Sequence, residues 1–147
     1  MPLRDVALTD ASVLQTASLA EAVSALFETR VAAIAVLDDA RRVLGILSER
    51  DVLGAVFPGY LAEIRHSAFL TDDASALDEL AARARDLPVR DFMRPAEVLE
   101  LSDSQIHAAE RLMHSSDDAL PVVEGDRFVG MLSVAGLCYA RLDRPTG

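Results

Sequence analysis

Hydrophobic and polar positions follow the same order twice along the chain. Residues 10–57 and 96–142 each predict a short strand, an amphipathic helix, an apolar strand and a charged turn. A second strand that ends in Gly-x-x-Ser and a further helix then complete each copy. An internal repeat of this kind predicts two supersecondary units that stack on each other and bury a common core.

The first helix of each copy begins with a predicted capping box, in which a hydroxyl and a side chain three residues later satisfy free backbone N–H groups. Ser18 and Glu21 fit this pattern in the first copy, and Ser102 and Gln105 fit it in the second. Apolar residues then recur at helical spacing and predict the buried helix faces. These residues are Leu19, Ala22, Val23, Leu26 and Phe27 in the first copy, and Ile106, Ala109, Leu112 and Met113 in the second.

Each copy also predicts a β-hairpin. Apolar strands are expected at 33–37 and 120–123, and the returning strands at 43–47 and 128–132. The turns between them contain acids, arginine and a small residue, which favours a hairpin. Runs this apolar are typical of strands buried on both faces, although a short buried helix has the same pattern.

A different segment separates the two copies. Pro58-Gly59 interrupts the pattern, residues 60–70 predict one helix, and a second is expected at about 74–86 before Pro88. The apolar content of this segment predicts that it packs on the repeats or on a partner subunit. The predicted division is repeat 1 at 1–57, a helical connector at 58–87 and repeat 2 at 88–147.

Composition narrows the functional classes. The chain has 147 residues, of which 51% are hydrophobic, so it can bury a core and is not expected to be disordered. Its net charge is −10, and its fourteen basic residues are all arginines that are scattered along the sequence. Because affinity for nucleic acid comes from clustered basic side chains, we expect no nucleic-acid partner.

The cysteine count, the N-terminal residues and the length of the apolar runs indicate the cellular setting. Cys138 is the single cysteine, so no disulfide framework and no thiolate metal site is expected. The first residues are too polar for a signal peptide, and the longest apolar runs are far shorter than the ~20 residues that cross a bilayer. We therefore expect a cytoplasmic protein without a membrane partner.

The residues around the hairpins carry a family resemblance. Leu-Pro-Val-Val-Glu at 120–124 and Gly-Ile-Leu-Ser-Glu-Arg-Asp at 45–51 stand where a tandem pair of CBS domains, called a Bateman module, has its characteristic stretches. The chain resembles such a pair over residues 7–57 and 88–142, and we expect a free-standing pair with no catalytic domain beside it. The resemblance implies an α/β (α+β) fold, with two β-α-β-β-α repeats packed about a pseudo-twofold axis and joined by the helical connector.

The resemblance also implies a ligand. CBS pairs commonly bind AMP, ATP or S-adenosylmethionine in two clefts, where the Asp of the motif contacts the ribose hydroxyls and the Ser lies near the first phosphate. Here these residues are Asp51 and Ser48. A carboxylate can accept from both hydroxyls of a cis-diol, and a Ser at a strand-to-helix junction lies beside N–H groups that favour an anion. Both residues also fit a capping box, so a purely structural role is the alternative.

Several further residues complete the predicted site. Arg50 and Arg30 are candidates for a phosphate contact, and neighbouring strand positions are expected to line the cleft. The predicted ligand-binding residues are Ser48, Asp51, Arg50, Ile46, Val98, Ala119 and Arg30.

The second copy departs from the pattern, because Gly136 stands where the acid is expected. We therefore expect at most one competent site. In the family, the Asp of one repeat shares its cleft with the other repeat, which places Asp51 opposite Asp117 and Asp118 and places Arg30 in the other cleft. Because like charges disfavour a phosphate unless a cation intervenes, this favours an adenosyl ligand of low negative charge or a magnesium-bridged nucleotide.

Catalysis and metal binding find no support in the sequence. His107 and His114 lie two helical turns apart, about 10.5 Å, which is too far to share one ion. No nucleophile motif or Gly-rich phosphate loop is present, so we expect neither an enzyme nor a bound cofactor. The main hypothesis is a regulatory module that senses an adenosine-type ligand, forms a homodimer and acts on a partner protein. The alternative is a dimerisation or protein-interaction scaffold with vestigial clefts.

Overall fold

The computed structural model describes residues 1–57 and 74–143 and confirms the predicted fold class. Repeat 1 contains β1 (Ser12–Leu14), α1 (Leu19–Thr29), β2 (Ala33–Leu37), β3 (Val43–Ser48) and α2 (Glu49–Val56). Repeat 2 contains β4 (Leu99–Glu100), α5 (Gln105–His114), β5 (Ala119–Glu124), β6 (Arg127–Ser133) and α6 (Val134–Leu142). A short 3-10 helix precedes each repeat, η1 (Leu3–Asp5) and η2 (Val89–Asp91).

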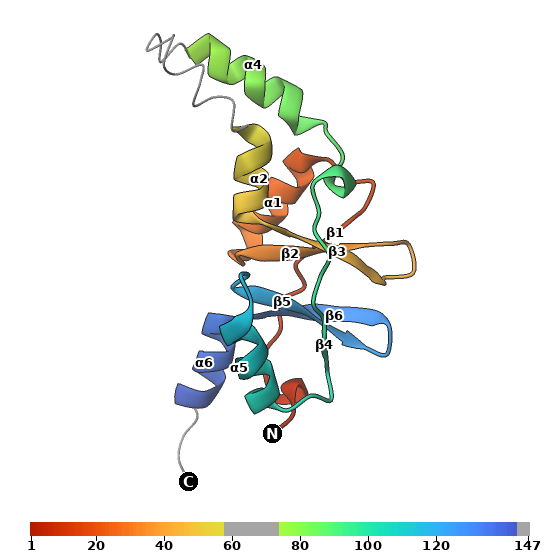
Figure 1. The fold of residues 1–147 in the computed structure, drawn as a ribbon, viewed down its shortest axis with the longest axis vertical. Coiled ribbons are helices and arrows are strands. Elements are labelled where there is room, and N and C mark those ends of the chain that lie inside the picture. Colours follow the sequence, from red (N-terminus) through yellow and green to blue (C-terminus); the bar gives the residue numbers. More distant parts are fainter. Residues whose placement is uncertain (58–73, 144–147) are drawn as a thin grey trace.

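Each repeat forms a three-stranded sheet. The strand orders are β1-β2-β3 and β4-β5-β6, with a parallel pair first and an antiparallel hairpin second. The ladders match in register, because Val13 pairs with Val36 as Leu99 pairs with Val122. The two sheets face each other at the centre of the molecule, and the helices lie on their outer sides (Figure 1). This arrangement places the strand-to-helix junctions of one repeat beside the other repeat.

The N-terminal residues of repeat 1 pack inside repeat 2. Leu3, in η1, is fully buried in a cluster with Leu99, Leu120 and Leu132. Its backbone N–H donates to the carbonyl of Asp103 at 2.9 Å. The core of repeat 2 therefore includes a residue that lies almost a hundred positions earlier in the chain.

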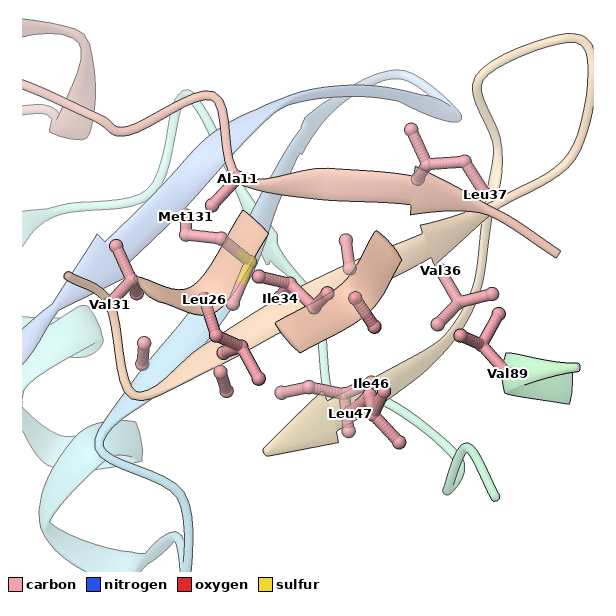
Figure 2. Close-up of a cluster of buried hydrophobic side chains, with 14 of the residues drawn as sticks. Ala11, Leu26, Val31, Ile34, Val36, Leu37, Ile46, Leu47, Val89 and Met131 are labelled. Atoms are coloured by element: carbon pink, nitrogen blue, oxygen red, sulfur yellow. The ribbon is translucent and has the colours of Figure 1, made fainter. Parts of the chain in front are cut away.

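The reverse exchange occurs at η2. Val89 is fully buried in the core of repeat 1, close to Val36 and Ile46 (Figure 2). Its N–H donates to the carbonyl of Ala17 at 2.9 Å. Because each core contains the other repeat's leading segment, separating the repeats would expose apolar residues of both cores.

Backbone pairs also cross between the repeats. Ile46 of β3 donates its N–H to the carbonyl of Arg94 at 2.8 Å, and the N–H of Arg94 donates back to Ile46 at 2.9 Å. A Cβ on the neighbouring Gly45 would lie 2.8 Å from the Arg94 carbonyl oxygen and 2.9 Å from the Sδ of Met93. The glycine of the motif is thus required by the close approach of the second repeat.

The predicted buried faces of the first helices are partly wrong. In α1 the buried residues are Leu19, Ala22 and Leu26, as predicted. Val23 and Phe27 were also predicted to be buried, but they are 43% and 83% exposed. In α5 the buried stripe is rotated by one residue relative to the prediction, so Leu112 is buried and Met113 is exposed. That stripe consists of Gln105, Ala108 and Leu112, whereas Ile106 and Met113 are each 82% exposed.

The predicted cap of α5 is also wrong. Ser104 accepts from the N–H of His107 at 3.0 Å, so Ser104 and not Ser102 is the N-cap. The helix begins two residues later than predicted, and the N–H of its first residue, Gln105, donates to the carbonyl of Met1 at 2.8 Å. In α1, by contrast, Ser18 accepts from the N–H of Glu21 at 3.2 Å, as predicted.

The connector is described only in its second part. The helix predicted at 60–70 lies outside the described residues, whereas the second one is present as α4 (Ala74–Arg85). This helix contacts α1 and α2 (Figure 1). None of the helices within residues 1–57 and 74–143 has the length and hydropathy needed to cross a membrane.

Candidate functional site

Asp51 and Ser48 stand at the start of α2 and form the predicted capping box. Ser48 is the N-cap, and its Oγ accepts from the N–H of Asp51 at 3.1 Å. In return the Oδ2 of Asp51 accepts from the backbone N–H of Ser48 at 2.8 Å and from its hydroxyl at 2.9 Å. The helix start is therefore held by the same two residues that the family motif assigns to a ligand.

Arg94 joins this motif to the second repeat. Its Nε lies 2.9 Å from both carboxylate oxygens of Asp51. At the other end of the guanidinium, Nη2 donates to one oxygen of Asp117 at 2.7 Å and Nη1 donates to the other at 3.3 Å. We call this set of Asp51, Arg94 and Asp117 the charged junction.

The charged junction is partly shielded from solvent. The side chains of Asp51 and Asp117 are 18% and 12% exposed, and that of Arg94 is 38% exposed. The hydrogen bonds to Asp117, and then those to Asp51, raise the pKa of Arg94 above its already high ordinary value. The guanidinium is thus fully protonated near neutral pH, and one cation separates two carboxylates that would otherwise repel each other.

The predicted opposition of acids is therefore present, but a cation lies between them. Asp51 and Asp117 share Arg94, whereas Asp118 is exposed and its carbonyl accepts from the N–H of Val134 at 3.0 Å. Arg94 is a residue that sequence reasoning missed. It lies far from Asp51 in the chain, and the available signal was an arginine just before Pro95 at the start of the second copy.

The structure places the other predicted residues in two groups. Ile46 and Ala119 are buried strand residues at the charged junction, since Ile46 pairs with Arg94 and Ala119 follows Asp117 by two positions. Arg30, Arg50 and Val98 are exposed. Among the described residues, none of these three takes part in the hydrogen bonds of Asp51, and Arg30 instead ends α1 in a left-handed conformation with φ of 57°.

The pseudo-equivalent positions on the other side of the repeat pair carry no charge. Gly136 is the third residue of α6, as Asp51 is the third residue of α2, and its N–H donates to Ser133 at 2.9 Å. The backbone of Thr9 pairs with that of Met131 as Arg94 pairs with Ile46, so Thr9 stands where Arg94 stands. Val31 precedes β2 by two residues as Asp117 precedes β5. All three charges are thus absent together, which leaves the charged junction on one side of the pseudo-symmetric pair.

A pocket of about 440 Å³ lies elsewhere in the molecule. It is formed at the ends of α5 and α6, and none of the seven predicted residues lines it. Its lining residues are Met1, Ser104, Gln105, Ile106, Ala109, Leu137 and Arg141. Within the described part of the chain, no group of three or more His, Cys, Asp or Glu side chains has the arrangement of a metal site.

Sequence comparison identifies the repeated unit. The family model described as CBS domain matches the chain twice, at residues 3–58 and 89–143. This chain belongs to the CBS domain family. Both matches begin at the 3-10 helices that precede the sheets, so the exchanged leading segments are part of the CBS unit as the family defines it. No protein among the curated sequences matches the chain.

Solved CBS structures share this fold at low sequence identity. A CBS domain-containing protein of unknown function from Kribbella flavida has a TM-score of 0.76 at 20% identity, with 96% of this chain and 97% of that chain covered. The CBS domain of a membrane protein from Sphaerobacter thermophilus has a TM-score of 0.74 at 20% identity, covering 95% and 87%. A CBS domain protein from Pyrobaculum aerophilum, solved in complex with AMP, has a TM-score of 0.66 at 23% identity, covering 94% and 90%.

Proposed function

We propose that this CBS pair is a regulatory module that binds an adenosine-containing small molecule at the charged junction. The observation that carries the proposal is the position of Asp51, a partly buried carboxylate at the start of α2 that faces the second repeat. The AMP complex of the Pyrobaculum aerophilum CBS protein supports an adenosine-type ligand for this architecture.

Each group at the junction has a defined chemical use. The carboxylate of Asp51 can accept hydrogen bonds from the vicinal hydroxyls of a ribose, as an acidic residue does in dinucleotide-binding folds. Ser48 presents its hydroxyl at the N-terminus of α2, next to backbone N–H groups that favour an anionic or polar substituent. Arg94 neutralises Asp117, and the ligand therefore meets less negative charge than the acids alone would impose.

Such a module acts by binding and not by catalysis. A ligand that contacts both repeats binds some relative arrangements of the repeats more tightly than others. This difference in affinity shifts the populations of those arrangements. The exchanged leading segments provide a route for such a shift, because Arg94 lies five residues after the buried Val89. A partner protein that contacts this chain in the cytoplasm would then respond to ligand occupancy.

Thermal unfolding of the full chain tests the proposal. We expect at least one compound among adenosine, AMP, ADP, ATP and S-adenosylmethionine to raise Tm. At ten times Kd the stabilisation is about 1.4 kcal/mol, or roughly 3–6 °C for a chain of this size. Guanosine and GMP serve as matched controls of the same charge and sugar. No rise with any adenosine compound would remove the ligand-sensing function.

A second candidate function is a protein-interaction scaffold, and exposed apolar residues favour it. Phe27 and Met113 occupy the same position counted from the first residues of α1 and α5, and they are 83% and 82% exposed. Two such equivalent surfaces suit a symmetric homodimer, the commonest form of self-association. Sedimentation of the full chain, with Phe27→Asp as the disrupting variant, measures this association. A dimer that responds to none of the adenosine compounds would favour the scaffold.

A further inference from the structure

Asp51 has little free hydrogen-bonding capacity in this structure. Its Oδ2 already accepts from the N–H and the hydroxyl of Ser48. The Nε–H of Arg94 donates to both Oδ1 and Oδ2. A carboxylate offers about four lone-pair sites in total. The oxygen that could receive a sugar hydroxyl is therefore the one that Arg94 faces.

Arg94 has an anchor that does not depend on Asp51. Two of its N–H groups point to Asp117, at 2.7 and 3.3 Å, and the side chain of Asp117 is only 12% exposed. Loss of the Asp51 contact would leave this charge-assisted pair in place. The guanidinium can thus give up one carboxylate without becoming an unpaired charge.

The internal repeat shows that the three charges belong together. The pseudo-equivalent positions on the other side of the pair hold Gly136, Thr9 and Val31, and α6 is still capped by Ser133. A CBS helix of this type therefore forms without the acid, and the paired arginine is absent where the acid is absent. Capping alone does not account for the charged junction.

We propose that Arg94 is an internal competitor for Asp51, and that a ligand binds by exchanging its two ribose hydroxyls for the Nε–H of Arg94. This inference rests on the proposed function and specifies the ligand class and the regulation of the same site. The favoured ligand carries vicinal hydroxyls, because two neutral donors can replace one charged donor on the carboxylate. After the exchange the guanidinium remains on Asp117.

The exchange of Arg94 for ribose hydroxyls also changes how the segment that contains Arg94 is held against repeat 1. The backbone of Arg94 pairs with Ile46 of β3 at 2.8 and 2.9 Å, and the same segment buries Val89 in the core of repeat 1. Release of the Arg94 side chain removes one of the contacts that hold this segment against repeat 1. Ligand occupancy is thereby coupled to the segment that joins α4 to β4.

Calorimetric titration with adenosine tests the proposal in two variants, one expected to raise the affinity for adenosine and one expected to lower it. Arg94→Met keeps the aliphatic part of the side chain and removes the competing donor, so it should bind adenosine about 10-fold tighter than the natural chain. Asp117→Asn leaves the full charge of Arg94 to Asp51 and should bind about 3-fold weaker. Arg90→Met is the control with unchanged affinity, because Arg90 lies on the same segment, is exposed and takes no part in the hydrogen bonds of the charged junction.

The direction of the change in adenosine affinity distinguishes competition by Arg94 from a purely structural role of Arg94. If Arg94 merely holds the repeats together, Arg94→Met should bind adenosine more weakly than the natural chain or equally well. When the natural chain binds adenosine, either of these results overturns the inference and leaves the proposed function in place. Binding by Arg94→Met alone, with a silent natural chain, supports it. If neither protein binds adenosine, the inference fails, and the thermal unfolding with the other adenosine compounds decides the proposed function. Arg94→Gln provides a second variant should Arg94→Met not fold, and unfolding curves verify each fold.

Discussion

Asp51→Ala should eliminate the ligand-induced rise in Tm for every adenosine compound that stabilises the natural chain. The substitution removes the carboxylate that we assign to the ribose hydroxyls, and it also removes half of the capping box of α2. Loss of the cap and of the Arg94 contact costs about 1–2 kcal/mol of stability. The variant still folds, since α6 forms with Gly136 at the equivalent position. Thermal unfolding with and without ligand measures both effects.

Asp38→Ala provides a matched control for this loss. The carboxylate of Asp38 accepts from the backbone N–H groups of Ala40 and Arg42, each at 2.9 Å, in the hairpin between β2 and β3. These hydrogen bonds lower the pKa of Asp38, with that from Arg42 as the main cause. Removal of this acid should lower stability without changing the ligand-induced rise. A rise that persists in Asp51→Ala would show that the ligand binds elsewhere.

Leu3→Ala should destabilise the chain by about 3 kcal/mol, although it changes the third residue of the sequence. Leu3 is fully buried in the core of repeat 2, where it meets Leu99, Leu120 and Leu132. Truncation leaves a cavity in a core that belongs to the other repeat, and it weakens the attachment of η1. We expect Tm to fall by roughly 6–12 °C in thermal unfolding.

The neighbouring Arg4→Ala isolates the effect of burial. Arg4 is exposed, and its ion pair with Glu124 spans 3.7 Å between side chains that are largely solvent-accessible. Such pairs contribute little, so this variant should stay within about 0.5 kcal/mol of the natural chain. Equal stability of the Leu3 and Arg4 variants would mean that the exchanged segment does not pack as described.

Local patterns in the sequence were sufficient for the elements within each repeat. The strand predicted at 33–37 coincides with β2, and the hairpin in the second copy differs from β5 and β6 by only one residue at each end. These strands are short apolar runs bounded by turn residues, and both properties are local. The cap of α1 at Ser18 was predicted for the same reason.

Contacts between the repeats were not predictable in this way. The exchange of Leu3 and Val89 involves 3-10 helices of three residues, which have too few positions to show a period. The repeated stretches Leu-Arg-Asp at 3–5 and Val-Arg-Asp at 89–91 were the signal that could have extended the repeat to these segments. The pairing of Asp51 with Arg94 depends on the same exchange and is equally non-local.

The exposed apolar side chains show a further limit of periodicity. Phe27 and Met113 follow buried positions of α1 and α5 by one residue, so they fall at the edge of the apolar stripe and outside the core. A hydrophobic pattern does not distinguish a face that packs inside the chain from one that is available to another molecule. The orientation of the helices on the sheets decides this, and that orientation is tertiary information.

In the proposed complex the carboxylate of Asp51 receives the vicinal hydroxyls of a ribose. Calorimetric titration of the natural chain with adenosine and with 2′-deoxyadenosine, under identical conditions, tests this contact, because the second compound lacks one of the two hydroxyls. Loss of a hydrogen bond to a charged acceptor predicts that the deoxy compound binds at least about 10-fold more weakly. Equal affinity for the two nucleosides, or no measurable binding of adenosine by either the natural chain or Arg94→Met, would show that Asp51 does not receive the ribose hydroxyls.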